Sequence, residues 1–110
     1  MQVTTKKRDE GAVITVIGDI DLYTSPDLRK AITKLAKKKT SPLVVDLKQV
    51  DYMDSSGVAT LVEGLQLTAR YDGSFRVASL NEGVREVFEL ARLDKVFDIY
   101  DDLDQALVGS

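Results

Sequence analysis

The apolar positions of the chain follow two periodicities, one typical of strands and one typical of helices. Continuous apolar runs rich in β-branched residues indicate buried strands, while apolar residues recurring every three or four positions indicate helices. The strands expected from these runs are 3–8, 12–18, 43–47, 75–78 and 96–100. Helices are expected to begin at Ser25, Ser56, Glu82 and Asp101.

Short polar residues mark the predicted helix starts. The Thr24-Ser25-Pro26 sequence predicts a hydroxyl cap followed by a proline in the first turn, and Asn81 predicts a second cap with Glu82 behind it. The first helix ends in a run of lysines, which complement the negative end of the helix dipole. A solvent-exposed helix end is therefore favoured over a phosphate- or partner-binding patch for Lys30, Lys34, Lys37, Lys38 and Lys39.

The expected element order is β-β-α-β-α-β-α-β-α. Strands separated by helices indicate parallel pairing, because a parallel crossover is usually helical. The first two strands have only the turn at Gly11 between them and should form a hairpin. The sequence thus predicts an α/β fold: a mostly parallel sheet of about five strands, an N-terminal β-hairpin and about four covering helices. The 110 residues are expected to form a single domain, 1–110.

Composition removes several classes of function. The net charge of −3 argues against direct nucleic-acid binding, which normally needs a clustered basic surface. The chain has no cysteine and no histidine. Disulfides, the usual zinc and haem ligands and a Ser-His-Asp mechanism are therefore excluded, and no metal or cofactor is expected.

The chain also lacks the patterns of membrane and export segments. The first ten residues have charges but no apolar segment behind them, unlike a signal peptide. No stretch reaches the roughly 18 consecutive apolar residues of a membrane span. We expect a soluble, cytoplasmic protein with no membrane association, and nothing in the sequence requires more than a monomer.

The most informative polar segment is Asp54-Ser55-Ser56-Gly57, between a predicted strand and a predicted helix. Its side-chain oxygens could simply cap the helix, with Gly57 giving the backbone room. A helix start also tolerates anions, so a phosphate on a serine here would leave the fold intact while adding about −2 charge to the surface. Asp21, in a second acidic loop, could solvate that loop, bind a metal or meet a basic partner.

The two loops belong to a set of motifs that resembles, in the same order along the chain, those of a known protein family. The chain resembles the anti-sigma-factor antagonist family of STAS domains nearly end to end. The resemblance rests on Gly18-Asp19-Ile20-Asp21, Ser25-Pro26, the 43–47 strand, Tyr52-Met53-Asp54-Ser55-Ser56-Gly57 and the stretch 84–97. In that family the residue after the loop aspartate is phosphorylated by the anti-sigma factor, a serine kinase, and a PP2C-type phosphatase removes the phosphate. The unphosphorylated form binds the anti-sigma factor and releases sigma.

The resemblance implies a regulatory role without catalysis. Ser55 becomes the expected phosphoacceptor, and Asp21, Asp54, Ser56 and Gly57 the expected partner-binding residues. Ser56 is expected to bond the helix amides. One departure is Glu63, on a helix where the family has few acids; it could change partner choice. STAS domains also serve as regulatory or scaffold modules in lipid transport, secretion and exopolysaccharide regulation, and this alternative function stays open.

Two other interpretations fit the sequence less well. A response-regulator receiver would use Asp46 as phosphoacceptor, with Asp19, Asp21 and Lys95 around it. Receivers, however, place two strand–helix units before the acceptor strand, whereas one helix is predicted here. An enzyme is disfavoured because Gly-x-Ser-x-Gly and phosphate-loop patterns are absent and only a carboxylate could activate Ser55.

Overall fold

A computed structural model describes residues 2–109 and contains the predicted order of nine elements. The strands are β1 (Gln2–Lys7), β2 (Ala12–Ile17), β3 (Leu43–Gln49), β4 (Phe75–Ala78) and β5 (Asp98–Tyr100). The helices are α1 (Ser25–Lys37), α2 (Ser55–Ala69), α3 (Glu82–Leu90) and α4 (Leu103–Val108). Met1 and Ser110, the ends of the predicted domain, lie outside the described residues.

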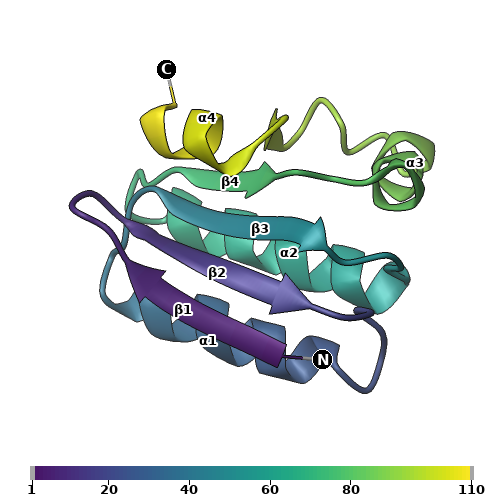
Figure 1. Ribbon diagram of the computed structural model, residues 1–110. Helices are drawn as coiled ribbons and strands as arrows, with labels where there is room; N and C mark the ends of the chain where they lie inside the picture. The colour runs from purple at the N-terminus through teal and green to yellow at the C-terminus, as the bar shows by residue number, and fades with distance from the viewer. Residues whose placement is uncertain (1, 110) are drawn as a thin grey trace.

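The strands form one sheet in the order β1-β2-β3-β4-β5 (Figure 1). β1 pairs antiparallel with β2, and the other neighbours pair in parallel. The predicted α/β fold with its N-terminal hairpin is therefore confirmed. Because β2, β3 and β4 run in the same direction, the loops that follow them lie at one edge of the sheet, on the right in Figure 1. We call this edge the loop edge.

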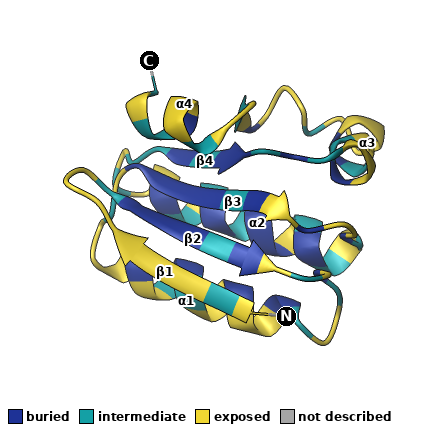
Figure 2. Cartoon of the chain, in the orientation of Figure 1, coloured by how far each residue is buried: buried dark blue, intermediate teal, exposed yellow. Residues whose placement is uncertain are grey.

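The main core lies between the sheet and the helices α1 and α2. Alternate side chains of β2 and β3 point to this side, because successive residues of a strand face opposite ways. They include Ile14 and Val45, which pack with Leu28 and Ile32 of α1. β2, β3 and β4 are mostly buried while β1 is mostly exposed (Figure 2). Amphipathic α1 thus has the predicted orientation, with its lysines in solvent.

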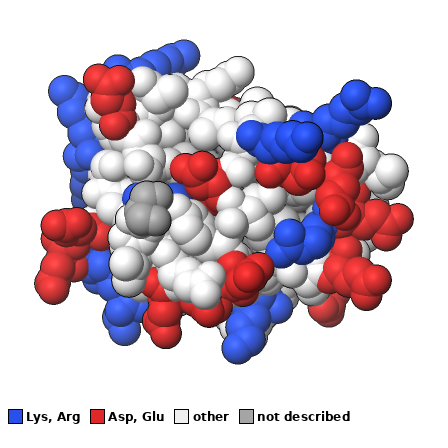
Figure 3. Space-filling view, turned by 90° about the horizontal axis from the view of Figure 1, so that it is seen from above, with Lys and Arg blue, Asp and Glu red and all other residues white. Residues whose placement is uncertain are grey.

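A smaller cluster lies on the opposite face of the sheet. Ala106 of α4 packs there with Val13, Val44 and Ala78. Arg76 donates a hydrogen bond of 2.8 Å to the Ala106 carbonyl, which helps to fix the end of this short helix. On the side of the molecule that carries α3 and α4, acidic and basic side chains are interspersed (Figure 3).

Several element boundaries differ from the prediction by one or two residues. β1 spans 2–7 and not 3–8, β2 ends at Ile17, β3 continues to Gln49 and α4 begins at Leu103. β5 begins at Asp98, not at 96, because the amides of Val96 and Phe97 both bond the Leu93 carbonyl in a turn. The ring of Phe97 is buried, with its centroid 5.3 Å from that of Phe88. In addition, α2 begins at Ser55 and not at Ser56.

Candidate functional site

Two loops at the loop edge are joined through their backbones. The Ile20 amide donates to the Tyr52 carbonyl at 2.9 Å, and the Asp54 amide donates to the Ile20 carbonyl at 3.1 Å. These bonds form a short parallel bridge between Ile20 and Met53. The chain can turn into the first loop because Gly18 has a φ of 104°, a left-handed value that favours glycine. The two acidic loops singled out in the sequence are therefore one structural unit.

Gly57 fits against this unit so closely that no side chain has room. A Cβ atom at Gly57 would lie 2.5 Å from Cγ of Met53 and 2.8 Å from Cγ2 of Ile20. Both neighbours are buried. The glycine of the motif therefore serves close packing between the α2 start and the bridge.

Asp54 caps α2. One carboxylate oxygen, Oδ1, accepts the Ser56 amide at 2.8 Å and the Gly57 amide at 3.4 Å. Asp54 has extended backbone angles, as a cap residue should. The expectation that Ser56 bonds the helix amides is wrong, because Asp54 occupies the cap position before the helix and Ser56 lies inside its first turn.

Ser55 is left exposed at the first position of the helix. Within residues 2–109 its hydroxyl makes no side-chain hydrogen bond of the kind that engages Thr60 or Thr68. A serine whose hydroxyl points to solvent, at a helix start and outside the core, is sterically accessible to a modifying enzyme.

Asp21 is used within its own loop. Its Oδ1 accepts the amides of Tyr23 at 2.9 Å and Thr24 at 3.0 Å, and the Thr24 hydroxyl at 3.1 Å. The amide of Thr24, helped by that of Tyr23, lowers the pKa of the Asp21 carboxyl below its ordinary value. Asp21 therefore shapes the loop that leads into α1, whatever it presents to a partner.

The predicted hydroxyl cap of α1 is not formed. Thr24 has helical backbone angles, and its side chain makes no cap bond. Its hydroxyl instead accepts the Asp21 amide at 2.9 Å and donates to the Asp19 carbonyl. The side chain is committed to closing the preceding loop, so the helix start relies on Pro26, which has no amide to satisfy.

The third loop of the edge is tied to the second by Asn81. Its side-chain amide donates to the carbonyl of Val50, and its oxygen accepts the Val84 amide at 3.0 Å. The predicted Asn81 cap of α3 is thus confirmed, and the same side chain fixes α3 against the loop that precedes Ser55.

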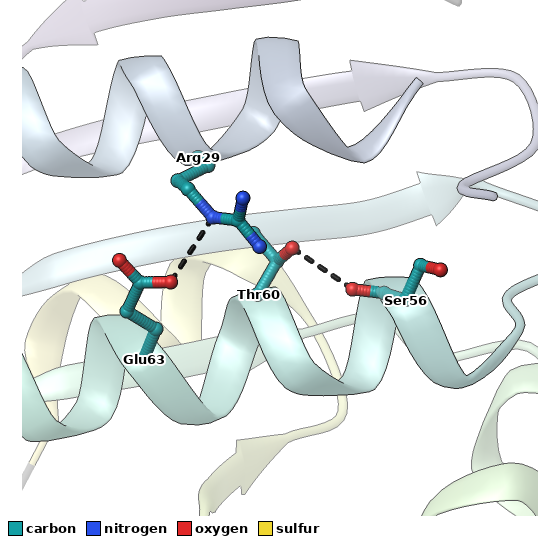
Figure 4. A network of polar contacts seen from close by, with 4 residues as sticks. All are labelled: Arg29, Ser56, Thr60 and Glu63. Carbon is teal, nitrogen blue, oxygen red and sulfur yellow. Dashed lines mark hydrogen bonds and ion pairs between the residues drawn. The ribbon is translucent and has the colours of Figure 1, made fainter. Parts of the chain in front are cut away.

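Glu63 is paired within the molecule (Figure 4). Its Oε2 lies 3.0 Å from Nε of Arg29, so the pair links α1 to α2 across the surface. One turn earlier, the Thr60 hydroxyl donates to the Ser56 carbonyl at 2.9 Å. The departure from the family pattern at Glu63 therefore has a partner in α1.

Three large apolar residues are exposed at this edge: Leu22, Tyr23 and Tyr52. The sequence analysis used Tyr52 only as part of a motif and did not consider Leu22 and Tyr23, for which the available signal was a pair of large apolar residues directly after the acidic Asp19–Asp21 segment. Among the described residues, no group of three or more acidic side chains is arranged to hold a metal ion. A hollow of about 540 Å³ lies near the start of α4, lined mainly by Asp46, Asp101, Asp102 and Asp104, and Ser55 is not among its lining residues.

Comparisons with known proteins show which family has this arrangement. The family model described as STAS domain matches residues 2–106. The anti-sigma-B factor antagonist of Bacillus subtilis is 29% identical over 99 residues, which cover 90% of each chain. None of the helices within residues 2–109 is long and apolar enough to cross a bilayer.

Solved structures agree with this comparison. The crystal structure of an anti-sigma factor antagonist from Mycobacterium paratuberculosis superposes with a TM-score of 0.89 at 31% identity, covering 97% of this chain and 91% of that one. The phosphorylated form of SpoIIAA, a Bacillus cell fate determinant, has a TM-score of 0.76 at 17% identity and covers 97% of both chains. At that identity the second likeness concerns the fold alone.

Proposed function

The chain belongs to the anti-sigma factor antagonist family of STAS domains, and we propose that it is a partner-switching antagonist controlled by phosphorylation of Ser55. In its unphosphorylated form it binds an anti-sigma factor with serine kinase activity, and sigma is released. Phosphorylation of Ser55 by that kinase ends the binding, and a PP2C-type phosphatase restores it. The chain itself acts by binding and performs no catalysis.

The observation that carries this proposal is that Asp54 caps α2 while Ser55, the next residue, is exposed. Asp54 satisfies the amides of α2, so the exposed Ser55 hydroxyl is free to accept a phosphate without loss of the helix cap. SpoIIAA, whose phosphorylated form has been solved, shares this fold, so the fold is compatible with a phosphate.

The binding surface proposed here is the loop edge. It combines the Asp21 loop, the Asp54–Gly57 segment and the exposed side of α2, which all follow strand ends at one edge of a parallel sheet. Within it, Asp21, Asp54 and Gly57 shape the surface, whereas Ser55 and half-buried Ser56 are candidates for direct contact.

The first experiment maps the phosphate. The chain is incubated with the purified anti-sigma factor of its own organism and ATP, and fragments are analysed by mass spectrometry. We expect phosphate on Ser55, no incorporation in Ser55→Ala, and normal incorporation in Ser56→Ala, the matched control. Phosphate on Ser56 would overturn the assignment.

The second experiment measures the switch. Ser55→Ala should bind the anti-sigma factor about as tightly as the unmodified chain, and the phosphorylated chain should bind at least about a hundredfold more weakly, since an unpaired charge in an interface costs several kcal/mol. Calorimetry measures both affinities, with melting curves as a check on folding. Equal affinities for the phosphorylated and unmodified chains would contradict the switch and favour a STAS scaffold role in a pathway without sigma.

A further inference from the structure

Three large apolar side chains at the loop edge are exposed. Tyr23 keeps 87% of its surface accessible, Leu22 66% and Tyr52 55%. Single exposed apolar residues need no explanation, but a group of them on one surface commonly marks an interaction site. We call Leu22, Tyr23 and Tyr52 the apolar collar.

The backbone bonds described above bring the collar residues to the same place. Tyr52 is bonded through its carbonyl to Ile20, which is two residues from Leu22. Asp54, directly before Ser55, is bonded to the same Ile20. The collar residues therefore come from two loops that are held as one unit, and one of these loops leads directly into Ser55.

The three loops at this edge carry a net negative charge. Its loops, residues 18–24, 50–55 and 79–82, contain Asp19, Asp21, Asp51, Asp54 and Glu82 but no lysine or arginine. With a net charge of −3 for the whole chain, −5 at these loops leaves +2 for the remaining residues.

We infer that the apolar collar is the anchor by which a protein partner holds the loop edge, and that the partner presents an apolar pocket edged by lysine or arginine. This inference rests on the proposed function, since the partner meant is the anti-sigma factor that acts on Ser55. Tyrosine is among the residues enriched in interface anchors, because it buries a large area with few rotatable bonds. The acidic rim supplies complementarity to a basic surface and speeds encounter.

The anchor is tested by truncating the collar. Affinity for the purified anti-sigma factor is measured by calorimetry for Leu22→Ala, Tyr23→Ala and Tyr52→Ala. We expect Tyr23→Ala to bind at least about tenfold more weakly, as for other anchor residues. Tyr23→Phe, which keeps the ring, should bind within about threefold of the unsubstituted chain.

The matched control is Val108→Ala, because Val108 is 83% exposed but lies in α4, outside the three loops. It should leave affinity unchanged. Amide spectra of each variant establish that the loop edge keeps its structure, as expected when an exposed side chain is shortened. Affinity of the unsubstituted chain should also fall as salt is raised, since the rim pairs with cations of the partner.

The outcomes separate this inference from the proposed function. If the unsubstituted chain does not bind the anti-sigma factor, the proposed function fails. If it binds but all three collar variants bind equally well, or Val108→Ala weakens binding as much as Tyr23→Ala, the anchor inference alone is overturned. Affinity that does not change with salt would overturn the basic rim of the partner pocket.

Discussion

Helices α1 and α2 begin with similar residues, but the first serine is buried in α1 and exposed in α2. Each has a serine at its first position, Ser25 in α1 and Ser55 in α2, with a short polar residue before it. Ser25 is buried, with 4% of its surface accessible, whereas Ser55 is exposed. The same residue type at the same helical position is therefore hidden in one helix and available for modification in the other.

The difference lies in the residue before each serine. Thr24 is folded back onto the Asp21 turn and makes no cap, so α1 begins as a continuation of a tight loop. Asp54 has extended backbone angles and caps α2 with its side chain, and Ser55, the first residue of the helix, is exposed. The hydroxyl of an exposed serine at a helix start is thus not needed for the cap when the preceding residue makes it.

The largest expected effect on stability comes from Gly57, which packs closely at the start of α2 and has no counterpart at the start of α1. Gly57→Val should destabilise the fold by about 3 kcal/mol, since its Cβ would overlap two buried side chains. The control is Gly83→Ala in the first turn of α3, where the nearest atom to a Cβ is 3.5 Å away and the change should stabilise by up to about 1 kcal/mol. Urea denaturation measures both, and a neutral Gly57→Val would contradict the close packing.

The next effect tests which residue caps α2. Asp54→Ala should lower the free energy of unfolding by about 1 kcal/mol, while Asp54→Asn, which still accepts amide hydrogens, should lose much less. Ser56→Ala should change stability by less than about 0.5 kcal/mol. Thermal unfolding of the three variants at neutral pH gives the comparison. A larger loss of stability for Ser56→Ala than for Asp54→Ala would show that Ser56, and not Asp54, caps α2.

A smaller effect on stability, specific to the loop that leads into α1, comes from the Asp21 carboxylate and depends on pH. The folded structure lowers the pKa of Asp21, so its carboxylate stabilises the fold above the unfolded pKa of about 3.9. That contribution is lost as the pH falls through the folded pKa. The stability gap between the unsubstituted chain and Asp21→Asn should therefore be constant from about pH 5 to 7 and shrink below about pH 4. A gap that widens at low pH would contradict the bonding of the Asp21 carboxylate.

The smallest effect concerns the pair that joins the two helices. Arg29 and Glu63 have side chains that are 48% and 44% exposed, so solvent screens their attraction. A double-mutant cycle with Arg29→Ala and Glu63→Ala should give a coupling of about 0.5 kcal/mol or less. A coupling above about 1 kcal/mol would show that the pair holds α1 and α2 together more strongly than its exposure suggests.

Much of the fold could be read from local patterns. The 75–78 strand, the Asn81 cap and the solvent-exposed lysines of α1 were predicted correctly. These features depend on hydrophobic period and on bonds between neighbours a few residues apart. The start of β5 was predicted too early, because turn bonds to Leu93 take amides that the apolar pattern assigned to the sheet.

The candidate site also has some features that follow from local sequence and others that depend on tertiary contacts. The sequence determined that Asp54, Ser55, Ser56 and Gly57 form a helix start with an acidic loop elsewhere in the chain, because residue types and strand–helix order are local properties. Only the tertiary structure decided that Asp54 makes the cap, that Ile20 bonds both Tyr52 and Asp54 through its backbone, and that Ser55 remains exposed. Several side chains near each helix start could accept the same amides. Which one does so depends on where the neighbouring loop holds it, and that position is fixed by contacts between residues more than thirty positions apart.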